Sequence, residues 1–198
     1  MTDPLSLLSR AFGRGVFPHQ LSWVLDLPGR SLLMSARTVA DRLPVAPDAQ
    51  VLEVGPGSGY YSVEVAKRVP DGGLTLVDIQ PEMLDKASRR LRAAGISRFQ
   101  TALADGKGLP FGAEAFDAIF LVTVLGEIAE QEKFLAEAMR VLRADGVLSI
   151  TEHHPDPDFE PEPVVRRRLE RAGFVAPQSS GWRWGYTLNA KKPSTPQP

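Results

Sequence analysis

The segment of this chain that is best suited to bind a ligand contains three glycines at alternate positions. The segment Val51–Ser62 reads VLEVGPGSGYYS, so Gly55, Gly57 and Gly59 follow a short apolar run typical of a buried strand. Residues from Val63 onward have helical spacing. Glycine permits positive φ and close approach of the backbone to a ligand, and a helix N-terminus presents free N–H groups. The pattern predicts a strand, a tight turn and a helix that bind a nucleotide-like ligand.

The spacing of the glycines indicates which ligand. A dinucleotide fingerprint requires a third small residue at the position that Tyr60 occupies here, and a large aromatic side chain argues against a pyrophosphate across the turn. The pattern present is E-x-G-x-G-x-G, from Glu53 to Gly59. It resembles motif I of the class I S-adenosylmethionine-dependent methyltransferases. The resemblance implies S-adenosyl-L-methionine as cofactor, with the Glu53 carboxylate near its methionine part; a purely structural Glu53 is the alternative.

Length and composition indicate an ordinary globular protein. The 198 residues suit one domain with a substantial core, and 43% apolar and 24% charged residues are usual values. A net charge of −1 encodes no general attraction to nucleic acid or anionic lipid. Cysteine is absent, which excludes disulfides, thiolate metal sites and cysteine nucleophiles. With neither a signal-peptide pattern nor a long apolar run, we expect a soluble cytoplasmic protein without stable membrane insertion.

The chain is expected to contain one domain with two flanking segments. Residues 1–44 are predicted to form an N-terminal helical segment or lid packed on the core, since apolar residues recur there at helical spacing between Gly and Pro breaks. A lid over the acceptor site, a dimer contact and a membrane-surface contact are alternatives for this segment. Residues 45–191 form the expected S-adenosylmethionine-binding methyltransferase domain, and residues 192–198 a flexible tail.

Strand and helix patterns alternate along the chain. Apolar runs predict strands at 51–54, 74–79, 99–103, 116–122 and 147–151, and two late strands near 174–179 and 183–190. Helical patterns fall at 32–43, 63–69, 81–94, 127–143 and 164–172. This order predicts an α/β fold: a doubly wound, Rossmann-like, seven-stranded and mostly parallel sheet with an antiparallel final strand and helices on both faces. Ligands of such sheets bind beyond the carboxyl ends of the strands.

Acidic residues follow two of these strands. Asp78 ends the second strand, where a carboxylate can accept hydrogen bonds from both ribose hydroxyls of an adenosyl group, and Ile79 could pack on the adenine. An N-cap of the following helix is the alternative for Asp78. Ala104 and Asp105 follow the third strand and resemble the family segment in which an acidic side chain meets the adenine amino group; the alternative is a surface turn.

Further matches extend the resemblance. The segments Leu109–Phe111 and Phe116–Ile119 match the family sequence that leads into the fourth strand, and Val122, at the end of that strand, is an expected cofactor contact. Tyr60 could line the cofactor pocket, because an aromatic face suits a sulfonium, or it could simply pack against its neighbours.

Two histidines, His153 and His154, follow the fifth strand. Adjacent residues of an extended segment point opposite ways, so one of the two could face the acceptor as a general base or an orienting group, with a polar loop as the alternative. No metal site is expected, because no third ligand has suitable spacing.

The predicted function is methyl transfer by in-line displacement to a small-molecule or lipid-like acceptor. The resemblance includes the quinone-biosynthesis C-methyltransferases. The sequence after the fourth strand, VTVL from Val122, lacks the D/N-P-P-Y/F motif of enzymes that methylate amino groups of nucleic acids. A non-catalytic cofactor-binding or partner protein and an NAD(P)-dependent oxidoreductase are the alternatives, and a homodimer remains open.

Overall fold

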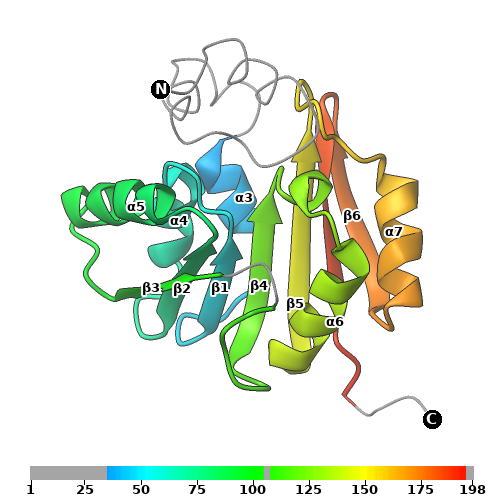
Figure 1. Cartoon of the computed structure of the whole chain (residues 1–198), viewed down its shortest axis with the longest axis horizontal. Coiled ribbons are helices and arrows are strands. Elements are labelled where there is room, and N and C mark those ends of the chain that lie inside the picture. The colour runs from blue at the N-terminus through cyan, green and yellow to red at the C-terminus, as the bar shows by residue number, and fades with distance from the viewer. Residues whose placement is uncertain (1–34, 105–107, 195–198) are drawn as a thin grey trace.

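A computed structural model describes residues 35–104 and 108–194, and a seven-stranded sheet forms the centre of this part of the chain (Figure 1). The strands are β1 Gln50–Val54, β2 Gly73–Asp78, β3 Phe99–Leu103, β4 Phe116–Val122, β5 Leu142–His153, β6 Val175–Trp182 and β7 Gly185–Lys191. The helices are α3 Ala36–Arg42, α4 Tyr60–Ala66, α5 Pro81–Ala93, the short 3₁₀ helix η3 Leu125–Glu127, α6 Gln131–Val141 and α7 Glu162–Arg171.

The strands lie in the order β3-β2-β1-β4-β5-β7-β6. Neighbouring strands from β3 to β5 pair in parallel, while β7 pairs antiparallel with both β5 and β6. The predicted fold class, a mostly parallel doubly wound sheet with an antiparallel final strand, is confirmed. The direction in which the chain adds strands reverses between β1 and β4, and this switch point is where open α/β sheets bind ligands.

Both faces of the sheet are covered by helices (Figure 1). One apolar cluster joins the sheet to α3, α4 and α5, and the other joins it to α6 and α7. The adjacent residues Val51 and Leu52 of β1 belong to different clusters, and both have 0% of their surface exposed. Burial on both faces explains why the strands at the centre are continuous apolar runs.

The helix predicted over 127–143 is wrong at both ends. Glu127 is the last residue of η3, residues 128–130 are irregular, and α6 begins at Gln131 and ends at Val141. Leu142 is extended and pairs with Phe116 as the first residue of β5, and its carbonyl accepts a hydrogen bond from Lys192 Nζ at 2.6 Å. Leu142 has 0% of its surface exposed. An apolar residue is expected to be buried in a helix as well as in a strand, so hydrophobic periodicity alone did not reveal the change from helix to strand.

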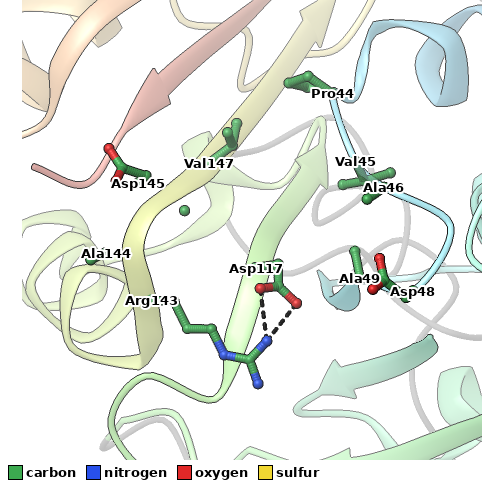
Figure 2. Close-up of a pocket in the computed structure, with 11 residues that line it drawn as sticks. Pro44, Val45, Ala46, Asp48, Ala49, Asp117, Arg143, Ala144, Asp145 and Val147 are labelled. Carbon is green, nitrogen blue, oxygen red and sulfur yellow. Dashed lines mark hydrogen bonds and ion pairs between the residues drawn. The ribbon is translucent and has the colours of Figure 1, made fainter. Parts of the chain in front are cut away.

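Asp117 connects three strands at their amino ends. Its carboxylate accepts a hydrogen bond from the Gln50 backbone N–H at 2.7 Å. It also forms an ion pair with Arg143, whose Nη1 lies 2.7 and 2.6 Å from the two oxygens. Figure 2 shows this pair with Pro44 and Val147, which line the same hollow. The hollow has a volume of about 330 Å³. The hollow lies at the sheet edge opposite to the carboxyl ends of the parallel strands, and it contains none of the predicted site residues.

We expect Asp117→Ala to lower the free energy of unfolding by about 1–3 kcal/mol, because a backbone N–H and a guanidinium lose the same charged acceptor. Urea denaturation measures the change. The control is Glu64→Ala, which removes the exposed pair of Glu64 with Lys67 and should change stability by less than about 0.5 kcal/mol. Equal effects of the two substitutions would show that Asp117 does not connect the strands.

Candidate active site

The predicted site residues lie at one edge of the sheet. Because β1, β2, β4 and β5 run in parallel, their carboxyl ends meet at that edge. The residues placed there are Glu53, Gly55, Gly57, Gly59, Tyr60, Asp78, Ile79, Ala104, Val122, His153 and His154. Asp105 lies outside the described residues. The fold thus assembles the set, while the role of each residue stays a prediction.

The turn after β1 uses all three of its glycines. Gly55, Gly57 and Gly59 have φ values of 67°, 54° and 76°, a backbone region that residues with a Cβ rarely adopt. The Gly55 N–H donates to the Val77 carbonyl at 2.9 Å, which holds the turn against β2. A Cβ on Gly59 would lie 2.8 Å from the Ala87 Cα, so this glycine also permits the close approach of α4 and α5.

Val124 closes the turn from the other side. A Cβ on Gly55 would lie 2.7 Å from Val124 Cγ2, so the loop after β4 touches the glycine turn. Thr123, with φ of 52°, leads into this loop and donates its N–H to the Thr151 carbonyl at 2.8 Å. Val124 is not among the site residues predicted from the sequence, because its contact with the turn depends on β4 lying next to β1.

Glu53 is a buried carboxyl beside the glycine turn. It has 2% of its surface exposed, and its Oε2 has no hydrogen-bond partner among the described residues. Burial raises the pKa of Glu53 to about 8, the nearby Asp78 charge raises the pKa further, and the Ser62 hydroxyl opposes the shift. A buried carboxyl oxygen without a donor is costly, so this position lacks a hydrogen-bond donor that a ligand could supply.

Asp78 ends β2 on the same side of the sheet. Burial raises its pKa, and hydrogen bonds from the Gln80 and Ile79 backbone oppose the shift. One of these bonds joins Gln80 N to Asp78 Oδ1 at 2.9 Å. The N-cap of α5 is Gln80, so the alternative of Asp78 as the N-cap is wrong. Ile79 is 47% exposed beside it, and the Ala104 N–H donates to the Asp78 carbonyl at 2.8 Å.

The two tyrosines after the turn differ in burial. Tyr60 is the first residue of α4 and is partly exposed, whereas Tyr61 is 3% exposed and belongs to the core. Their rings meet edge to face, with centroids 5.0 Å apart. Tyr61 therefore packs in the core, and Tyr60 is the tyrosine whose position permits contact with a ligand.

The two histidines have different surroundings. His153 is the last residue of β5, pairs with Gly185 and is 7% exposed; its Nδ1 lies 3.1 Å from the His154 carbonyl. His154 is exposed, and its ring lies on Phe159 with centroids 4.0 Å apart. Within residues 35–104 and 108–194, no three His, Asp or Glu side chains are placed to hold a metal ion.

A glycine turn after β1, a buried acid within β1 and an acid at the end of β2 define an α/β domain for an adenosine-containing ligand. Residues 51–146 match the family model of the methyltransferase domain. This part of the chain is therefore a methyltransferase domain, and the resemblance to class I S-adenosylmethionine-dependent methyltransferases is confirmed.

The curated proteins that this chain resembles are also methyltransferases. The chain is 34% identical over 130 residues to a demethylmenaquinone methyltransferase of Thermus thermophilus, a match that covers 65% of this chain and 58% of that protein. The chain spans about half the length of the curated relatives it matches.

Solved structures share the fold. A SAM-dependent methyltransferase from Aquifex aeolicus superimposes with a TM-score of 0.83 at 24% identity, covering 89% of this chain and 100% of that chain. The [4+2]-cyclase SpnF superimposes with a TM-score of 0.71 at 20% identity, covering 96% of this chain and 91% of that chain.

The residues present fit the cofactor of this family, S-adenosylmethionine. Glu53 has a buried oxygen that lacks a donor, which suits the ammonium group of the methionine part. Asp78 retains acceptor capacity beyond its bond with Gln80 N, which suits the ribose hydroxyls. The three glycines of the turn, which have no Cβ, leave the backbone bare of side chains where the cofactor would pass.

We expect cofactor affinity to rise with pH between about 6 and 8, by up to about tenfold per unit, because an ammonium group favours ionised Glu53 whereas the free protein holds it protonated. Isothermal titration calorimetry with S-adenosylmethionine at several pH values measures this. Glu53→Gln should bind more weakly and show a flatter profile. The same pH dependence in the variant would show that Glu53 does not contact the cofactor.

Proposed function

We propose that the protein transfers a methyl group from S-adenosylmethionine to a small-molecule or lipid-like acceptor by in-line displacement. The observation that carries the proposal is the buried carboxyl of Glu53, unpartnered at Oε2 beside the glycine turn, inside the segment that matches the methyltransferase domain. The name of the relative from Thermus thermophilus, demethylmenaquinone methyltransferase, supports an acceptor of the quinone type.

The chain's own contribution to such a reaction is binding and alignment. The cofactor supplies a methyl group on a positively charged sulfur, and the electrons of the broken bond stay on that sulfur. Glu53, Asp78 and the glycine turn hold the cofactor at the switch point. The acceptor gives up a proton as it gains the methyl group. Alignment of the two reactants is worth up to about 7–11 kcal/mol, so a strong general base is not required.

His153 and His154 remain the predicted residues for orienting the acceptor or taking its proton. The partial exposure of Tyr60 supports its proposed contact with the sulfonium. The absence of nucleic-acid partners, the cytoplasmic location and the homodimer also stay predictions. The described residues contain no helix that is long and apolar enough to cross a membrane.

Two alternatives share this fold. A likeness to the cyclase SpnF is a reminder that fold alone does not determine the reaction. Tyr60, in place of the small third residue of a dinucleotide turn, argues against an NAD(P)-dependent oxidoreductase. A cofactor-binding protein without catalysis would bind S-adenosylmethionine and transfer no methyl group.

We expect S-adenosylmethionine and S-adenosylhomocysteine to raise the melting temperature by roughly 5–10 °C at about 100 times their dissociation constants, with no shift from NAD or NADP. Gly57→Val should abolish this shift, because φ of 54° and the approach of the ligand both exclude a branched side chain. Asp78→Ala should reduce it.

Differential scanning fluorimetry gives the shifts, and S-adenosylhomocysteine release in the presence of quinol acceptors gives the activity. A shift with the dinucleotides alone would replace the methyltransferase proposal with the oxidoreductase. A shift with the adenosyl sulfur compounds and no release with any acceptor would favour the non-catalytic protein.

A further inference from the structure

Glu152 is a second buried carboxyl at the functional edge of the sheet, and the sequence analysis did not single it out. It lies on β5 one residue beyond Thr151, which pairs with the last residue of β4, Val122. Glu152 is 1% exposed, and in the part of the chain that the structure describes neither Oε1 nor Oε2 has a partner within hydrogen-bond geometry. The Leu125 backbone N–H is the one donor that favours the ionised carboxyl, and it offsets the burial of Glu152 only in part.

The charges that face Glu152 are negative. Burial raises its pKa to about 9, and the carboxylates of Asp156, Glu160 and Glu127 raise it further, while the Leu125 backbone N–H opposes the shift. These groups come from the loop after β5 and from η3, both at the carboxyl end of the sheet.

Neighbouring polar groups are already engaged with one another. Tyr186, which pairs with Glu152 across β5 and β7, donates its hydroxyl to the Glu160 carbonyl at 2.8 Å. The Glu160 carboxylate forms an ion pair with Arg168. Tyr186 and Glu160 are thus satisfied by other groups, and among residues 35–104 and 108–194 no cation or hydroxyl is bonded to Glu152.

The cofactor proposed for Glu53 is not the missing partner of Glu152. Glu53 is level with Phe120 on β4 and Ser149 on β5, so Glu152 lies two strands across and three residues further along. These offsets separate the two Cα atoms by about 14 Å. Glu152 shares a sheet face with Ile150, toward α6 and α7, whereas the side chain of Glu53 points to the face of α3 and α4. A cofactor held by Glu53 and Asp78 would extend from β1 toward β2, which lies on the side of β1 opposite to β4 and β5.

We propose that Glu152 binds a hydroxyl or amine group of the methyl acceptor, and that this position excludes acceptors that would place an anion there. The proposal rests on the proposed function, since it names the acceptor side of the same site. Either group supplies the hydrogen-bond donor that the carboxyl lacks. An anion would face Glu127, Asp156 and Glu160 without compensation.

The first test uses the free protein and needs no acceptor. Glu152→Met removes an unsatisfied carboxyl and keeps most of its volume, so the melting temperature should rise by about 2–5 °C at pH 8. The gain should shrink toward pH 5, because a raised pKa makes wild-type stability fall as pH rises from the ordinary glutamate range through about 9.

The matched control is one residue away. Thr151 is also 1% exposed, but its hydroxyl is bonded to that of Thr187 at 3.0 Å. Thr151→Val removes a satisfied group and should lower the melting temperature. A fall of similar size in Glu152→Met would show that Glu152 is a structural carboxyl and would overturn the proposal.

The second test measures ligand binding by calorimetry with S-adenosylhomocysteine present at saturation. The probes share a naphthalene ring: 2-methyl-1,4-naphthohydroquinone kept reduced, its dimethyl ether, 1-naphthylmethylamine and 1-naphthoate. Wild type should bind the hydroquinone or the amine at least tenfold more tightly than the ether and the carboxylate. The stronger of the two identifies the donor. Glu152→Met should lose this preference.

The two proposals fail differently. Failure of S-adenosylhomocysteine to bind wild type would overturn the proposed function. Its unchanged binding to wild type and Glu152→Met, together with no preference of wild type for either donor-bearing probe, would overturn the role of Glu152 alone.

Discussion

The parallel pairing of β1 with β2 on one side and β4 on the other determines where every candidate functional group lies. Because the sheet grows from β1 in both directions, the crossover helices after β1 and β4 lie on opposite faces of the sheet and leave an opening at the carboxyl ends of these strands. The glycine turn occupies this opening, held to β2 by the Gly55 N–H and touched by Val124 from the loop after β4. The backbone of the turn is therefore free of side chains. The groups on its two sides come from β2 and from the loop after β4.

Carboxyl groups at the two ends of the sheet have opposite energetics. At the amino end, Asp117 accepts a backbone N–H and a guanidinium, so its charge is compensated within the fold. At the carboxyl end, Glu53 and Glu152 are almost completely buried, and Oε2 of the first and both oxygens of the second lack donors. A fold selected for stability alone would satisfy or replace such groups. Their cost is understandable where a bound ligand completes their hydrogen bonds.

The sequence predicted most of the fold because its central strands are buried on both faces and its turns carry strong breakers. The glycine turn, the strand ending at Asp78 and the strand 116–122 were located from local patterns alone. Contacts between strands distant in sequence were not predictable in this way. The clash that a Cβ on Gly59 would make with Ala87 requires the packing of α4 on α5, and the contact of Val124 with Gly55 requires the order β1-β4.

The burial of Glu152 could not be predicted from the sequence. In the sequence it is one polar residue in Ile150–His154, a stretch that a solvent-facing strand end would also explain. Its burial arises from η3, the loop after β5 and β7, which meet only in the folded protein. The match to the methyltransferase domain ends at residue 146, before Glu152, His153 and His154. The predicted cofactor-binding residues therefore lie in the matched part of the chain, and the end of β5 with the loop that follows it is where the choice of acceptor would be encoded.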